Sequence, residues 1–125
     1  MMKSRISLAA ATLVAAVVGG TLAAAAPAQA TSAYGCGYPR VCFYLTTSSW
    51  VNDSPTASYQ DVTSSYQTLG SRSRGSVEAY NSRNDDGALL HFTNGRTFCL
   101  LPNHSASLRS IGTVDKIKIM TSADC

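Results

Sequence analysis

Apolar and polar residues alternate over short stretches of this chain, and turn-forming residues separate the stretches. The runs that predict strands are Val41 to Leu45, Ala57 to Val62, Ser76 to Asn81 and Val114 to Ile119. No stretch keeps the apolar period of 3.6 residues that marks an amphipathic helix. The pattern therefore predicts an all-β domain, closed as a compact Greek-key sandwich or barrel.

A hairpin is predicted in GALLHFTNGRTFCLLP, from Gly87 to Pro102. Asn94-Gly95 suits a two-residue type I′ turn, because both central residues of that turn need φ > 0. The expected register pairs Leu90 with Cys99 and His91 with Phe98. It places Ala88, Leu90, Phe92, Cys99 and Leu101 on one face, and Leu89, His91, Phe98 and Leu100 on the other. Both faces are apolar, so the hairpin is either buried on both sides or presents one side to a partner.

The segments between these runs are predicted to be irregular. Thr46 to Thr56 is expected to be a loop around Trp50, and Ser64 to Ser76 a connection rich in Ser, Gly and Arg. In the last strand, Ile117 and Ile119 are expected to face inward, with Lys116 and Lys118 facing outward. Outward lysines are typical of an edge strand protected against further pairing.

Residues 1–30 have the three parts of a signal peptide. Lys3 and Arg5 precede an apolar run from Ile6 to Ala26, and Ala28-Gln29-Ala30 is a small-x-small cleavage site. A membrane anchor is the weaker interpretation, because the cleavage site follows the run directly and no basic cluster comes after it. The sequence predicts a secreted, extracellular domain of residues 31–125 with no membrane attachment after cleavage.

All four cysteines, Cys36, Cys42, Cys99 and Cys125, lie in the expected mature domain. An exported domain of this size has a marginal core, so an even set of cysteines predicts two disulfides. Three pairings are possible, and the short spacing of Cys36 and Cys42 favours a loop between them, with Cys99 paired to Cys125. A zinc site would need closer CxxC-type pairs.

Charge gives little indication of a partner. Without Lys3 and Arg5, eight basic residues face seven acidic ones, so the mature net charge is about +1. Arg72, Arg74 and Arg83 form the one local basic cluster, next to Ser and Gly residues that indicate a solvated loop. Nucleic-acid binding needs a clustered basic face, so a nucleic-acid partner is not expected. The domain is expected to be a monomer.

The spacing Cys36-x5-Cys42, with Phe43-Tyr44 after it, resembles the opening of the small secreted actinobacterial peptidase inhibitors, whose known member inhibits metalloproteinases. That resemblance implies a βγ-crystallin-like Greek-key fold. The crystallin motif is Tyr, four residues, an aromatic, any residue, then Gly. Tyr80 to Gly87 has this spacing with Asp85 in place of the aromatic, and Tyr44, Trp50 and Asn52 come close to it. Two degenerate motifs are expected, at about 36–76 and 77–125.

An inhibitor needs a rigid exposed segment that fits a protease cleft. Cys99-Leu100-Leu101-Pro102 is the candidate inhibitory segment: a disulfide would anchor Cys99, Pro102 would stiffen the chain, and Leu100 or Leu101 would fill the apolar pocket of a thermolysin-like enzyme. The alternative is that the two leucines belong to the core. Thr46 to Pro55 and Asn103 to Ser110 are further exposed candidates. The expected partner is an extracellular protease, metalloproteinase or subtilisin-like.

Catalysis is not expected. Glu78, His91 or His104, and Arg83 or Arg96 could in principle form the site of a small secreted hydrolase such as a ribonuclease, but HExxH, GxSxG and phosphate-loop motifs are absent. No cofactor or metal is predicted. Val114 to Lys118 lacks the ligands of a crystallin-type calcium site, and Asn84 to Gly87 offers oxygens without a bidentate Glu, which favours a turn. The main alternative function is a non-inhibitory extracellular βγ-crystallin-like binding or structural domain.

Overall fold

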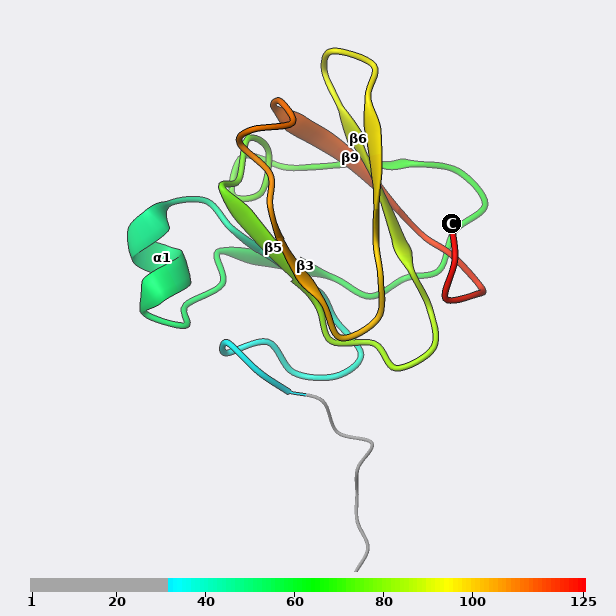
Figure 1. Ribbon diagram of the computed structural model, residues 1–125, viewed down its shortest axis with the longest axis horizontal. Coiled ribbons are helices and arrows are strands. Elements are labelled where there is room, and N and C mark those ends of the chain that lie inside the picture. Colours follow the sequence, from blue (N-terminus) through cyan, green and yellow to red (C-terminus); the bar gives the residue numbers. More distant parts are fainter. Residues whose placement is uncertain (1–31) are drawn as a thin grey trace, which may run out of the picture.

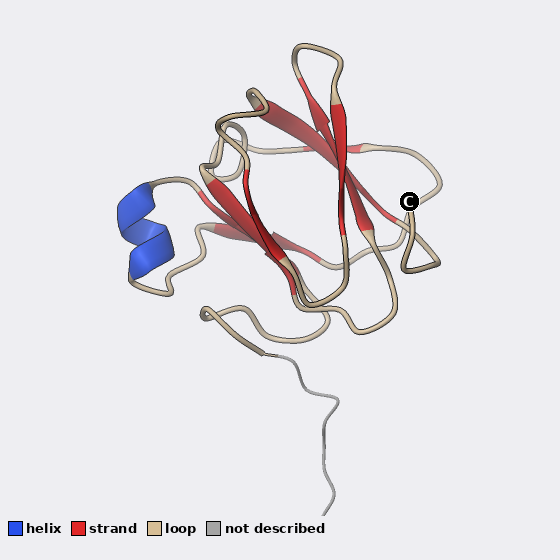
Figure 2. Ribbon diagram, viewed as in Figure 1, coloured by secondary structure: helices blue, strands red, loops and turns tan. Residues whose placement is uncertain are grey.

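The computed structural model describes residues 32–125, which form two antiparallel sheets of four strands (Figure 1, Figure 2). The first sheet contains β2 (Val41–Tyr44), β3 (Ala57–Tyr59), β5 (Glu78–Asn81) and β8 (Ser105–Ser107). The second contains β4 (Gln67–Thr68), β6 (Ala88–Phe92), β7 (Thr97–Leu100) and β9 (Val114–Ile119). A short helix, α1 (Thr47–Val51), connects β2 to β3. The all-β prediction is confirmed for this part of the chain, and the predicted signal peptide lies outside the described residues.

The domain has two halves, β2 to β5 and β6 to β9, and each half places one strand in the sheet formed mainly by the other. The strand order is β3-β2-β5-β8 in the first sheet and β4-β9-β6-β7 in the second. Of the first four strands, β2 to β5, only β4 lies in the second sheet, where it pairs with β9. Of the last four, β6 to β9, only β8 lies in the first sheet, where it pairs with β5. Each half therefore completes the sheet of the other.

The core lies between the two sheets. Its buried side chains come from β2, β5, β6, β7 and β9 and from two connecting segments: Val41, Phe43, Leu69, Ala79, Ala88, Leu90, Phe92, Leu100, Leu108, Val114, Ile117 and Ile119. Each fully buried aliphatic or aromatic side chain of this kind contributes about 1.5–3 kcal/mol relative to an exposed one. Within residues 32–125, no helix is long and apolar enough to span a membrane.

Strand β2 is buried on both faces, which explains its unbroken apolar sequence. Val41 and Phe43 point into the core between the sheets. Cys42 and Tyr44 point the other way and join a second buried cluster with Cys36 and Tyr80, against which Trp50 of α1 packs. The chain that precedes β2 and the helix that follows it therefore cover the outer face of the first sheet.

The hairpin forms, but its predicted register is wrong by one residue. Leu90 pairs with Phe98 instead of Cys99, and Leu89 pairs with Cys99. The turn is a three-residue loop in which the Gly95 N–H donates to the Phe92 carbonyl at 2.9 Å and only Gly95, at φ 87°, is left-handed. Asn94 keeps a negative φ because its side chain is engaged elsewhere, donating to the Ile111 carbonyl at 2.9 Å.

Thr46 to Thr56 is not the predicted loop throughout, because it contains α1. Thr46 caps the helix: its hydroxyl accepts the Ser49 N–H, and the Ser49 hydroxyl accepts the Thr46 N–H, both at 3.1 Å. This is a capping box with Ser where Glu or Gln is usual. Five residues are too few to show a helical apolar period, so the sequence pattern did not indicate the helix.

Strand β9 is predicted correctly in extent but not in position. Ile117 and Ile119 are fully buried, as expected. The strand is not an edge, however, because it pairs with β6 on one side and β4 on the other. Lys118 does not guard an edge; its Nζ lies 5.3 Å from the centre of the Tyr66 ring. The partner strand β4 has only two residues, too few to give a periodic signal.

Candidate functional site

A tight turn joins β7 to β8 and exposes part of the candidate inhibitory segment. It runs from Leu101 to His104, and the His104 N–H donates to the Leu101 carbonyl at 3.2 Å. Pro102 occupies the second position and Asn103, at φ 63°, the third. Proline followed by a residue with positive φ is the requirement of a type II turn, and Asn is the best residue after Gly for the third position. The local sequence therefore specifies this turn.

Asn81, at the end of β5, holds the turn in place. Its side chain is fully buried, and its Nδ2 donates to the Leu100 carbonyl at 3.0 Å and to the Asp86 carbonyl at 2.9 Å. Its Oδ1 accepts the Arg83 N–H at 3.0 Å. Its backbone N–H donates to the His104 carbonyl, and its carbonyl accepts the Asn103 N–H at 2.8 Å. Asn81 therefore holds the chain before the turn, at Leu100, and in its second half, at Asn103 and His104.

The structure divides the candidate inhibitory segment into a buried and an exposed part. Leu100 belongs to the core with 1% of its surface exposed, so it does not fill the pocket of a partner in this fold. Leu101 is 40% exposed. The difference follows from the hairpin register, since a shift of one residue exchanges the two faces of a strand. Leu101 is therefore the apolar side chain that this segment presents to solvent.

The disulfide between Cys99 and Cys125 ties β7 to the last residues of the chain, with 5.6 Å between the two Cα atoms. The same chain end is held by Gly87, whose N–H donates to the Ser122 carbonyl at 2.7 Å and whose carbonyl accepts the Met120 N–H at 2.9 Å. A Cβ at Gly87 would lie 2.6 Å from the Ala123 carbonyl oxygen, so this contact requires glycine. The disulfide therefore links β7, the strand before the turn, to a chain end that Gly87 also holds.

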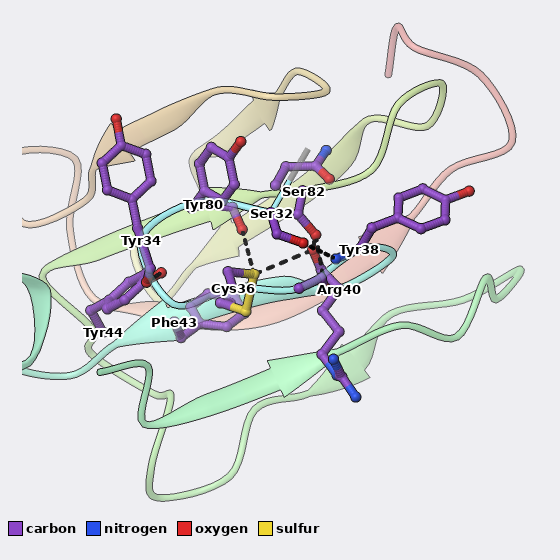
Figure 3. The surroundings of a disulfide bond; sticks show 12 residues. Ser32, Tyr34, Cys36, Tyr38, Arg40, Phe43, Tyr44, Tyr80 and Ser82 are labelled. Atoms are coloured by element: carbon purple, nitrogen blue, oxygen red, sulfur yellow. Dashed lines mark hydrogen bonds between the residues drawn. A yellow bond between two sulfur atoms is a disulfide. The ribbon is translucent and has the colours of Figure 1, made fainter. Parts of the chain in front are cut away.

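The second disulfide, Cys36–Cys42, closes a loop that lies against Ser82 and Tyr80 (Figure 3). Both disulfides follow the pairing that the sequence favours. Two disulfides in a domain of this size are typical of an extracellular or otherwise oxidising environment. Residues 32–125 contain no free cysteine.

Aromatic side chains cover the outer face of the first sheet beside this loop. Tyr34 packs against Trp50 and Tyr80, with ring centres 4.7 and 5.0 Å away, and Tyr44 donates its hydroxyl to the Tyr34 carbonyl at 2.6 Å. Burial, with a smaller contribution from the charge of Asp53, raises the pKa of Tyr44 above its ordinary value. Burial also raises the pKa of Tyr80. Both hydroxyls therefore stay protonated near neutral pH, and that of Tyr44 serves as a structural hydrogen-bond donor.

The residues considered for catalysis are not brought together. His91 Nδ1 lies 2.7 Å from Asp115 Oδ1, and Glu78 Oε1 accepts the Ser107 hydroxyl at 3.0 Å. Arg83 pairs with Asp86 at 2.7 Å, and His104 Nδ1 donates to the Pro102 carbonyl at 2.8 Å. Within the described part of the chain, no hydrogen bond or ion pair joins any two of Glu78, Arg83, His91, Arg96 and His104. Glu78, Arg83, His91 and His104 each bond a residue outside the set considered for catalysis.

The structure of the Asn84 to Gly87 turn shows how its polar groups are used. Asp86 directs Oδ2 to the Arg83 guanidinium and its carbonyl to Asn81, so two of its oxygens are occupied. Among residues 32–125, no group of three or more His, Cys, Asp or Glu side chains is placed to hold a metal ion.

Comparison with known proteins identifies no similar family, protein or structure. No family model matches the sequence, no curated protein is significantly similar to it, and no solved structure matches the fold. The class of the protein is therefore defined by its own structure, as a disulfide-linked all-β domain of two antiparallel sheets.

Proposed function

We propose that this chain is a secreted protein that binds the active-site cleft of an extracellular protease without being turned over. The observation that carries the proposal is the exposed Leu101–His104 turn, which is fixed by the buried Asn81 and by the Cys99–Cys125 disulfide. A segment that is rigid before binding loses little conformational entropy on binding, which favours tight and slow-releasing contact. Leu101 supplies the apolar side chain that enters the protease pocket.

The same hydrogen bonds account for resistance to cleavage. A protease must polarise the carbonyl of the bond that it hydrolyses. The carbonyl of Leu100 accepts Asn81 Nδ2, and the carbonyl of Leu101 accepts the His104 N–H. Both hydrogen bonds must break before the turn can open, so they support a segment that stays folded in the cleft instead of being processed as a substrate.

A βγ-crystallin-like Greek-key fold is part of the same proposal. The reciprocal exchange of β4 and β8 supports two interlocked Greek-key motifs of the βγ-crystallin type. Tyr44 to Asn52 lies between β2 and β3, whereas Tyr80 to Gly87 lies between β5 and β6, so the two motif-like stretches occupy non-equivalent positions. The two disulfides support secretion, together with the signal peptide predicted from the sequence.

A non-inhibitory extracellular binding domain is the second candidate, and a different feature favours it. An open hollow of about 350 Å³ lies beside the Cys36–Cys42 loop and is lined by Gly35, Gly37, Arg40 and Ser58, among others. This volume is near the lower end of the range for small-molecule sites. The hollow offers one guanidinium and hydroxyl groups to a small polar ligand.

Titration of the purified, disulfide-bonded protein against thermolysin and against subtilisin tests the proposal. We expect stoichiometric inhibition of at least one of them, weakened about ten-fold by Leu101→Ala. The control is Val51→Ala, which shortens a side chain that is 67% exposed on α1 and should leave inhibition unchanged. Absence of inhibition of both enzymes at micromolar protein would contradict the proposal and favour the binding domain.

A further inference from the structure

The loop from Gly37 to Arg40 is as rigid as the Leu101 turn and is also exposed. The Cys36–Cys42 disulfide closes it. Hydrogen bonds hold the carbonyls of the loop. The single O–H of Ser82 lies between the Arg40 carbonyl, 2.7 Å from Oγ, and the Gly37 carbonyl, 3.0 Å from it, and Arg83 Nη1 donates to the Pro39 carbonyl at 2.8 Å. Tyr38, at the tip, is 49% exposed, and its side chain takes part in none of the loop's hydrogen bonds. Figure 3 shows it pointing away from the disulfide.

Three consecutive residues fix both exposed loops. Asn81 holds the Leu101–His104 turn, while Ser82 and Arg83 hold the Gly37–Arg40 loop. The loops lead into β2 and β8, the two neighbours of β5, and enter the sheet at the same end, as the pairs Val41–Asn81 and Tyr80–Ser105 show. Neighbouring strands are about 4.8 Å apart, so the two loops enter the sheet about 10 Å from each other, on either side of β5.

The size of a stable interface then determines what a partner must cover. A standard protein–protein interface buries about 800 Å² on each partner, which is a patch about 30 Å across. A protease seated on Leu101 with an interface of this size would also reach the start of β2, three residues after Tyr38. Tyrosine is enriched among the residues that dominate binding, because its ring buries a large area at a small cost in side-chain entropy.

We infer that Tyr38 is a second binding and specificity-determining residue for the protease that receives Leu101. The inference rests on the proposed function and adds the chemistry of the partner: beside the apolar pocket for Leu101, the protease offers a groove that accepts an aromatic ring. Affinity is divided between two pre-organised loops on one scaffold, so each loop alone binds weakly.

The test measures inhibition constants for whichever of thermolysin or subtilisin the wild-type protein inhibits. We expect Tyr38→Ala to weaken inhibition about ten-fold and Tyr38→Phe, which keeps the ring, less than about three-fold. The factors for Tyr38→Ala and Leu101→Ala should multiply in the double variant, since sites that far apart act independently. Val51→Ala is the control for loss of an exposed apolar side chain away from both loops.

Two failures are distinguishable. If Leu101→Ala weakens inhibition and Tyr38→Ala does not, the inference is overturned and the proposed function stands. If the wild-type protein inhibits neither protease, both are overturned. Unfolding midpoints in urea are measured for every variant, so that a change in affinity is interpreted only where the midpoint equals that of the wild type.

Discussion

Replacing Asn81 with alanine should destabilise the domain more than any other substitution of a single amide side chain among residues 32–125. The side chain is fully buried and makes three hydrogen bonds, two to the carbonyls of Leu100 and Asp86 and one from the Arg83 N–H. Loss of the side chain leaves the buried Leu100 carbonyl without this donor and removes two part-buried bonds, and each bond is worth about 1 kcal/mol or more. The free energy of unfolding should therefore fall by about 3 kcal/mol.

Urea denaturation at 25 °C, followed by tryptophan fluorescence from Trp50, measures this loss. The loss of free energy is the change in midpoint multiplied by the slope m. Because a changed slope would indicate altered compactness, both the midpoint and the slope are fitted. Asn52→Ala is the matched control: Asn52 is exposed and its Nδ2 donates to one exposed hydroxyl, that of Ser48, so a loss below about 0.5 kcal/mol is expected. A loss below about 1 kcal/mol for Asn81→Ala would refute the view that Asn81 holds the turn.

Three further predictions concern other contacts. Gly87→Ala should destabilise the domain by about 1–3 kcal/mol, because its Cβ would meet the Ala123 carbonyl oxygen, while Gly70→Ala, with nothing near the new methyl group, should not; urea midpoints compare the two. Replacing Cys99 and Cys125 with serine should cost about 3.5 kcal/mol, against about 2.4 kcal/mol for Cys36 and Cys42, since the disulfide with the longer loop restricts the unfolded chain more; the opposite order of unfolding midpoints would contradict this. The raised pKa of Tyr44 means that the folded chain keeps a proton that the unfolded chain releases above pH 10, so the contribution of Tyr44 to stability should be constant below pH 10 and fall above it. Tyr44→Phe should make that alkaline fall shallower, and an unchanged slope in a series of urea midpoints from pH 8 to pH 11 would count against the assignment.

The sequence alone determined features that depend on neighbouring residues. Alternating apolar residues predicted β5 and β9, and short apolar runs bounded by turn residues predicted β2, β6 and β7, each within a few residues. The spacing of the cysteines favoured the two disulfides that form. Pro102 followed by Asn103 specifies its turn locally, and the sequence selected this segment for its proline and cysteine.

The tertiary structure decided which residue of the segment is exposed. Asn94-Gly95 is compatible with two turns, and the bond from Asn94 Nδ2 to Ile111, 17 residues away, accompanies the three-residue loop. That choice shifts the hairpin by one residue, which buries Leu100 and leaves Leu101 in solvent. The sequence also gave no sign of the role of Asn81, because its partner Leu100 lies 19 residues further along the chain and in the other sheet. Local patterns record which face a residue prefers, whereas strand order, register and shared hydrogen bonds are set by contacts between segments that lie far apart in the chain.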